Sequence, residues 1–160
     1  MDLVLPEEQK KIEEDFFQTT GPEPFSDDFC GKYLKNLARN KTQPVKAFIM
    51  TNQTVAGVGN IYANESLFAA GIRPSRKVSN ISLKSWDNLV CKIRQVLKHA
   101  ISCGGSTISD FVNASQKRGY FQMNFKVYGK NGHNCPTCHS IIKKIIIGGR
   151  ASYYCPQCQK

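Results

Sequence analysis

The sequence has no apolar segment after Met1 and no apolar run of the length that crosses a membrane. We therefore expect neither a secreted nor a membrane-spanning protein, and we place the chain in the cytoplasm. The 160 residues are 41% hydrophobic, which is enough for one compact domain or for a domain with an appendage.

Acidic side chains are scarce after residue 30. Residues 31–160 hold 20 of the 22 Lys and Arg residues but three of the twelve acids, which gives this part an excess of 17 positive charges. Such a surface attracts a polyanion, and nucleic acid is the partner that we expect. A solvated basic face without a partner is the plainer alternative. An anionic membrane is disfavoured, because the strongest amphipathic stretch is flanked by other structured segments.

Four cysteines near the C-terminus form two CxxC pairs that are separated by sixteen residues. This spacing places four thiolates around one tetrahedral zinc ion, so we expect a structural zinc site. Two disulfides are the alternative, disfavoured because nothing marks a secreted chain. His139 follows a ligand directly and could compete for the metal, although we expect it to be a solvated neighbour. The predicted ligands are Cys135, Cys138, Cys155 and Cys158.

Cysteines outside the pairs have no partner by pattern. We expect Cys30, Cys91 and Cys103 to be reduced thiols, with Cys91 on the polar side of a helix.

The segment between the two CxxC pairs reads IIKKIIIGGRASYY, residues 141–154. Two β-rich runs joined by Gly148-Gly149 predict a hairpin with a two-residue turn. Arg150 lies near the tip of that hairpin. Its planar guanidinium suits a phosphate or a groove of bent DNA, whereas a surface arginine without a partner is the alternative.

The middle of the chain predicts helices. A short one is expected over 7–17, and Gly21-Pro-Glu-Pro24 indicates a linker. Ser26 predicts an N-cap for a helix near 27–39, and Pro44 predicts the first position of a helix over 45–50. The next helix runs from Asn60 to Ala70 and is stopped by Gly71. The clearest helix covers 83–101, with one apolar sector formed by Leu83, Trp86, Leu89, Val90, Ile93, Val96, Leu97, Ala100 and Ile101.

The loop before the third of these helices contains Gly57-Val-Gly59-Asn60. Its glycines permit a close backbone approach, and the amide groups that start the helix favour an anion. Asn60 could donate to a phosphate oxygen there. A simple interhelical turn is the alternative interpretation.

The run QTVAGVGNIYANESLFAAGIRP, residues 53–74, closely resembles the helix–two-turn–helix segment of the formamidopyrimidine-DNA glycosylase and endonuclease VIII family. GPEPFSDDF at 21–29 resembles the interdomain linker of that family. GYF at 119–121 and VYG at 127–129 resemble the stretch before its zinc finger, and residues 150–160 resemble the finger itself. The resemblance runs from about residue 20 to the end, and the GVGNIYA run fits the formamidopyrimidine branch better.

The resemblance implies a bacterial, nucleoid-associated enzyme of base-excision repair. Such enzymes flip oxidised purines such as 8-oxoguanine and formamidopyrimidine out of bent duplex DNA, cut the glycosidic bond as a hydrolase and break the strand as an AP lyase. In the family, the residues that match Asn60 and Arg150 contact phosphates at the flipped nucleotide, and the arginine donates a proton in δ-elimination. The implied DNA-binding set is Lys41, Lys46, Gly59, Asn60, Tyr120 and Arg150, with Tyr120 in a loop over 116–125 that covers the extruded base.

One departure from the family pattern concerns the nucleophile, which is the secondary amine of an N-terminal proline. In this chain Pro6 precedes Glu7 but is acylated by Leu5, so it has no nucleophilic lone pair. The sandwich domain that carries the family's nucleophile is not expected in residues 1–20, which are too few to build it. We therefore expect no glycosylase activity from this chain alone, whether it is a fragment or the product of a gene for the DNA-gripping half.

The expected architecture is mainly α. An acidic segment and linker (1–24) precede a four-helix helix–two-turn–helix domain (25–125), and a four-cysteine zinc-finger β-hairpin (126–160) follows. We expect a monomer that binds double-stranded DNA with damaged or abasic sites, and a missing N-terminal catalytic half as a second partner. The alternatives are a stand-alone DNA-binding module and a zinc-ribbon domain for protein interaction.

Overall fold

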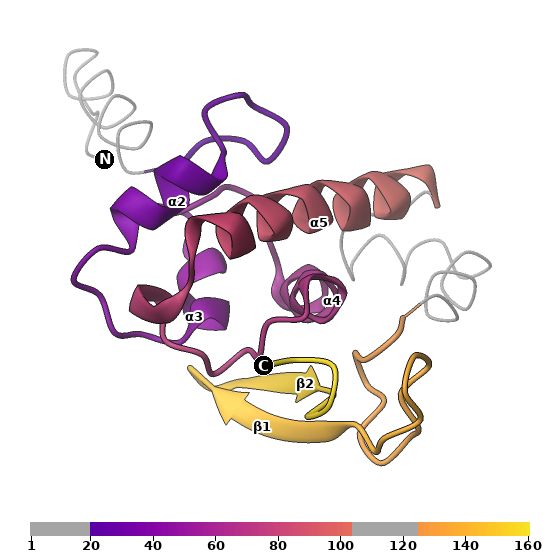
Figure 1. Cartoon of the computed structure of the whole chain (residues 1–160). Helices are drawn as coiled ribbons and strands as arrows, with labels where there is room; N and C mark the ends of the chain where they lie inside the picture. Colours follow the sequence, from indigo (N-terminus) through magenta and orange to yellow (C-terminus); the bar gives the residue numbers. More distant parts are fainter. Residues whose placement is uncertain (1–19, 104–124) are drawn as a thin grey trace, which may run out of the picture.

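The computed structural model describes residues 20–103 and 125–160. In this part of the chain, four α-helices and one 3-10 helix precede a two-stranded antiparallel sheet (Figure 1). This agrees with the expected helical unit followed by a β-hairpin. The elements are α2 (Gly31–Leu37), α3 (Val45–Ile49), α4 (Asn60–Ala70), η1 (Val78–Asn80), α5 (Leu83–Ser102), β1 (Lys143–Ile147) and β2 (Arg150–Tyr154).

Helix α4 lies at the centre of the molecule. It packs against α5 on one side and against β2 on the other, so the hairpin and α5 lie on opposite sides of it (Figure 1). Every residue from Asn60 to Phe68 is buried, including four with polar side chains. A helix that is covered all round needs no polar face, but each of its polar groups needs a partner.

The core of the helical part is built on the apolar stripe of α5. Trp86, Leu89 and Ile93 are fully buried, and the ring of Trp86 lies 5.6 Å from that of Phe48 in α3. The predicted sector is confirmed for its central members. Its two ends are exposed, because they lie in the first and last turns of the helix, where neighbouring elements cover it less: Leu83 is 43% exposed and Ile101 59%.

The strap, which we define as residues 20–29, is bound to the helical part on both sides. At its start the Gly21 amide donates to the Asn52 carbonyl over 2.6 Å, and the Ala56 amide donates to the Pro22 carbonyl over 3.0 Å. These bonds fasten the strap to the loop between α3 and α4, one residue before Gly57.

Arg94 of α5 holds the rest of the strap. Its guanidinium donates to the carbonyls of Pro24 and Ser26 over 2.8 Å and to that of Phe29 over 2.6 Å. The Ser26 hydroxyl accepts from Asp28 in a local turn. The prediction that Ser26 caps a helix from residue 27 was therefore wrong: α2 begins at Gly31, because the strap carbonyls are bound by Arg94.

Two other helix ends were predicted more accurately from the sequence than the start of α2. Pro44 is the N-cap of α3 rather than its first residue, with an extended ψ of 141°. Gly71 ends α4 as predicted, in the left-handed conformation with φ 72°. The sequence signals for these ends were local, and the structure departs from them by one residue at most.

The hairpin has the predicted two-residue turn. Ile147 pairs with Arg150, and Lys143 pairs with Tyr154 at the open end. Gly148 and Gly149 both have positive φ, 57° and 76°, as a type I′ turn requires. The turn places Arg150 at the first position of β2, and its side chain is exposed.

No helix within residues 20–103 and 125–160 is both long enough and apolar enough to span a bilayer. The predictions of a helix over 7–17, of a DNA contact by Tyr120 and of most of the loop over 116–125 concern residues outside the described ranges.

Candidate zinc centre and nucleic-acid interface

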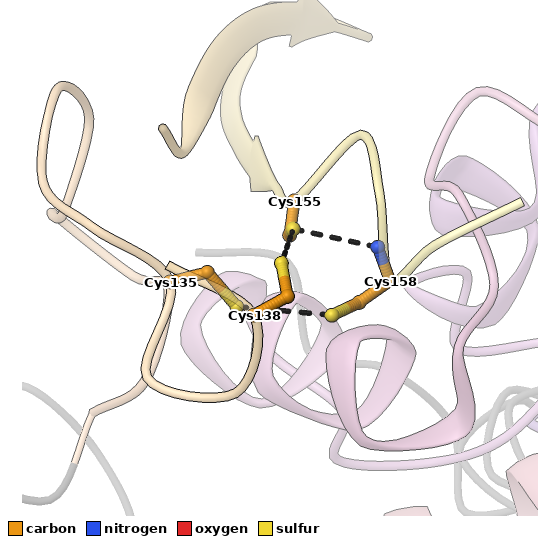
Figure 2. Close-up of side chains that lie close together, drawn as sticks. All are labelled: Cys135, Cys138, Cys155 and Cys158. Carbon is orange, nitrogen blue, oxygen red and sulfur yellow. Dashed lines mark hydrogen bonds between the residues drawn. The ribbon is translucent and has the colours of Figure 1, made fainter. Parts of the chain in front are cut away.

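The four predicted cysteine ligands converge at the base of the hairpin, and their ligand atoms all lie within 4.8 Å of one another (Figure 2). Sγ of Cys135 lies 3.8 Å from that of Cys158, and Sγ of Cys138 lies 3.4 Å from that of Cys155. Four sulfurs at about 2.3 Å from one central ion would be about 3.8 Å apart. The arrangement therefore fits one structural zinc ion, and all seven cysteines are free of disulfides.

Burial and local hydrogen bonds shift the pKa values of the cysteine thiols in different directions. Hydrogen bonds from Ser140 lower the pKa of the Cys138 thiol to about 6, whereas desolvation raises the pKa of Cys158 to about 12 and also raises that of Cys155. Zinc binding must therefore displace protons from part of the set. His139 is exposed and lies outside the cluster, as expected.

The C-terminal end of the finger is fixed to the end of α4. Gln159 is fully buried: its side-chain oxygen accepts from the Cys155 amide, and its side-chain nitrogen donates to the Ile72 carbonyl, both over 2.8 Å. The backbone of Lys160 also exchanges hydrogen bonds with Gly71 and Arg73. The zinc knuckle is therefore hydrogen-bonded directly to the segment that follows helix α4.

Asn64, near the middle of α4, holds strand β2. Its side-chain oxygen accepts from the Tyr153 amide over 2.7 Å. Its side-chain nitrogen donates to the Ala151 carbonyl over 3.3 Å and to the Asn60 carbonyl over 2.9 Å. The side chain thus bonds β2 on both sides of Ser152 and is anchored in its own helix.

Lys46 and Asn60 converge at the N-terminal end of α4 on the backbone next to Arg150. We call these three residues the phosphate cluster, after the role that the sequence predicts for them. Nζ of Lys46 donates to the Asn60 side-chain oxygen over 2.5 Å and to the Ala151 carbonyl over 3.2 Å. The Asn60 side-chain nitrogen donates to the same carbonyl over 3.2 Å. Arg150 precedes Ala151 in the chain, so the cluster combines α3, α4 and the hairpin tip.

The Lys46 ammonium is an unusual member of this cluster. Its side chain is fully buried, and both hydrogen-bond partners are neutral groups. Desolvation, followed by the positive charge of Arg150, lowers the pKa of Lys46 to about 8.

Glu65 fixes the segment that leads into the finger. Its carboxylate accepts three backbone amides, from Lys126 over 2.6 Å, Val127 over 2.9 Å and Tyr128 over 3.1 Å. Burial raises the pKa of Glu65, and the three hydrogen bonds oppose that shift. One of the few acids of the basic part is therefore used as a structural clamp.

The other residues that the sequence predicts to bind DNA lie outside the phosphate cluster. Gly59 is the exposed N-cap of α4 without a side-chain cap, and a Cβ there would meet no atom within 4 Å. Gly57 has φ 81°, which only glycine adopts easily. Lys41 is exposed, with its ammonium 5.5 Å from the ring of Phe48, and the structure gives it no contact with the phosphate cluster.

Sequence reasoning missed Asn64, Glu65 and Gln159 as structural contacts. A signal was present for two of them, because Asn64 and Glu65 are polar residues in a helix that is otherwise largely apolar. Their partners outside α4 lie 61 to 89 residues away in the chain, so no local pattern identifies them.

Comparisons with known proteins agree with this geometry. The formamidopyrimidine-DNA glycosylase H2TH domain matches residues 20–112, and the zinc finger found in FPG and IleRS matches 132–160. The formamidopyrimidine-DNA glycosylase of Psychromonas ingrahamii is 50% identical over 139 residues, which are 87% of this chain and 52% of that protein. That of Marinobacter nauticus is 51% identical over 140 residues, 88% of this chain and 52% of that protein.

Solved structures give the same result. The Lactococcus lactis glycosylase bound non-covalently to DNA with an AP site has a TM-score of 0.80 and 32% identity over 95% of this chain and 54% of that one. Its complex with FAPY-dG DNA has a TM-score of 0.81 and 33% identity, over 95% and 55% of the two chains. The chain spans about half the length of the relatives that it matches. By its helix–two-turn–helix domain and its zinc finger, the chain belongs to the formamidopyrimidine-DNA glycosylase family.

Proposed function

We propose that this chain binds double-stranded DNA with damaged or abasic sites and holds its backbone in the phosphate cluster. The observation that carries the proposal is that Lys46 and Asn60, at the N-terminal end of α4, both bond the carbonyl of Ala151, the residue that directly follows Arg150. The solved relatives bound to abasic-site and FAPY-dG DNA support it.

The cluster has the chemistry that a phosphate requires. A buried ammonium with neutral partners is costly, and an arriving anion would offset that cost. The uncapped start of α4 adds amide donors and the positive end of a helix dipole, and Gly59 leaves room for a phosphate to approach. Arg150 adds a planar donor fork on the exposed tip of the hairpin.

Other parts of the proposal rest on family membership. In a complete enzyme we assign Arg150 as proton donor in δ-elimination, acting with an N-terminal catalytic half on oxidised purines. Lys41 and Tyr120 are assigned to further contacts with DNA. The division into an acidic segment and linker (1–24), a helical domain (25–125) and a finger (126–160) stays a prediction, as do the monomeric state and a place on the bacterial nucleoid.

A salt titration of binding to an abasic-analogue duplex tests the proposal. We expect log affinity to fall linearly with log salt, with a slope of about −0.9 for each phosphate neutralised. Arg150→Ala should weaken binding by about 1–3 kcal/mol. Lys77→Ala, which removes an exposed cation of the segment before η1, is the matched control and should cost less.

Two outcomes would contradict the proposal. A flat salt response would favour a zinc ribbon that binds protein. An unchanged affinity of Arg150→Ala would show that the hairpin tip does not contact the duplex.

A further inference from the structure

We propose that Asn64 is a positioning residue: it holds β2 so that Arg150 faces the site of Asn60. This inference rests on the proposed function, because it concerns how the phosphate cluster is assembled. Asn64 is buried, and its side-chain oxygen and nitrogen are both bonded to backbone groups of this chain, so we assign it no contact with the duplex.

The carboxamide of Asn64 takes the place of a neighbouring strand. Its oxygen accepts the amide of Tyr153 and its nitrogen donates to the carbonyl of Ala151, the two groups that flank Ser152. A peptide group of an adjacent strand would offer the same donor and acceptor. The second hydrogen of the side-chain nitrogen donates to the carbonyl of Asn60, four residues earlier in α4. The bonds on the nitrogen therefore fix the orientation of the side chain.

The anchor lies next to the functional side chain. Arg150 lies between the two-glycine turn, which directly precedes it, and Ala151, which directly follows it. The far end of the hairpin is fixed by the cysteine cluster. Asn64 therefore supplies the fixed point at the tip, whereas zinc supplies the one at the base.

The Ala151 carbonyl receives more donors than it needs. Lys46, Asn60 and Asn64 all donate to it, at 3.2, 3.2 and 3.3 Å, although a carbonyl oxygen has two lone pairs. One donor can leave and this partly buried acceptor still keeps two hydrogen bonds. We assign that part to Asn60, whose amide is then free for a phosphate, while Asn64 keeps β2 in place.

The plainer interpretation is that Asn64 only stabilises the fold. A double-mutant cycle separates the two, because a positioning residue acts on DNA binding through Arg150. Asn64→Leu removes the hydrogen bonds at similar volume and without a new charge. Ser66→Ala is the matched control, since Ser66 is a fully buried polar residue of the same helix whose hydroxyl has no hydrogen-bond partner in the described residues.

The measurement is the affinity for an abasic-analogue duplex in both backgrounds, with zinc content and helical circular dichroism as checks of folding. We expect Asn64→Leu to weaken binding by about tenfold when Arg150 is present and by less than twofold in Arg150→Ala. Ser66→Ala should change neither value. Equal factors in both backgrounds, or no effect of Asn64→Leu, would overturn the inference. If Arg150→Ala itself has no effect, it is the proposed function that fails.

A second measurement needs no variant. In the wild-type chain, NMR signals of the Asn60 side-chain amide should move when the abasic duplex is added, because its partner changes. Those of Asn64 should stay in place. Equal movement of both signals would overturn the inference, even if every Asn64 variant failed to fold.

Discussion

At the scale of single residues, the cationic side chain that is buried is more informative than those that are exposed. Lys41 lies on the surface, as most lysines do, whereas Lys46 is fully buried among neutral acceptors. The sequence predicted both as contacts to the DNA backbone without separating them. Their difference in burial predicts a difference in pH dependence.

The lowered pKa of Lys46 makes DNA affinity depend on pH. Free Lys46 loses its proton near pH 8, below its ordinary 10.5, whereas a bound phosphate favours the ammonium. Binding therefore takes up a proton above pH 8, and affinity should fall by about tenfold between pH 7 and 9.5. Fluorescence anisotropy at constant ionic strength measures this. Lys46→Met should bind more weakly at pH 7 and lose most of the slope.

Lys41→Met is the control and should keep the slope of the wild type. The lowered pKa of Lys46 has the opposite effect on the stability of the DNA-free protein, which it makes rise with pH. Since the fold disfavours the ammonium, the contribution of Lys46 to stability rises with pH between about 8 and 10.5. If the DNA affinity of Lys46→Met still fell with pH as in the wild type, another group would be responsible for the pH dependence.

At the scale of elements, signals carried by adjacent residues predicted the structure well, and those that depend on distant partners did not. The glycine pair of the hairpin turn, the stop of α4 at Gly71 and the apolar stripe of α5 are local signals, and each was confirmed. The predicted start of α2 was wrong, because Arg94, which lies 65 to 70 residues away in the chain, binds the carbonyls of the strap. The clamps of Asn64 and Glu65 escaped prediction for the same reason.

The candidate site divides in the same way. The four zinc ligands were predictable from spacing. Asn60 and Arg150 were predicted from the glycine loop, the hairpin turn and the family resemblance, and their contact with DNA stays a prediction. The meeting point at Ala151 was not predictable, because it is a backbone carbonyl with no sequence signature.

Removal of zinc should separate the finger from the helices. The buried residues of the helical core all lie outside the finger, although Tyr128 of the finger packs against them. The second core joins Val127, Ile142 and two cysteines to Phe68 of α4. With a strong chelator we expect loss of DNA binding and of amide protection in β1 and β2, because the hairpin loses its anchor. Helical circular dichroism should remain largely unchanged.

Readdition of zinc should restore binding, which controls for damage by the chelator. Loss of the helical signal in step with the metal would contradict the independence of the two cores.

At the scale of the whole molecule, the residues predicted to bind DNA and the family's catalytic nucleophile belong to different parts of the sequence. Residues 31–160 carry the positive excess, and the described residues supply the candidate grip on DNA. The resemblance implies an N-terminal proline amine as the family's nucleophile, whereas the nitrogen of Pro6 in this chain is acylated by Leu5.

We therefore expect binding without covalent chemistry. Incubation of the chain with a duplex containing 8-oxoguanine, followed by borohydride, should give no trapped adduct. A full-length glycosylase of the family serves as the positive control. A trapped adduct would show that another amine of this chain attacks the sugar, and mass spectrometry of the digest would identify it.

The strap has a consequence for any protein segment that is joined ahead of it. Since Gly21 and Pro22 are bonded to Asn52 and Ala56, such a segment leaves from one fixed point beside the loop between α3 and α4. Its direction is then set by helices that it need not touch, and a tether inserted after Thr20 would change the alignment of two halves without altering either one.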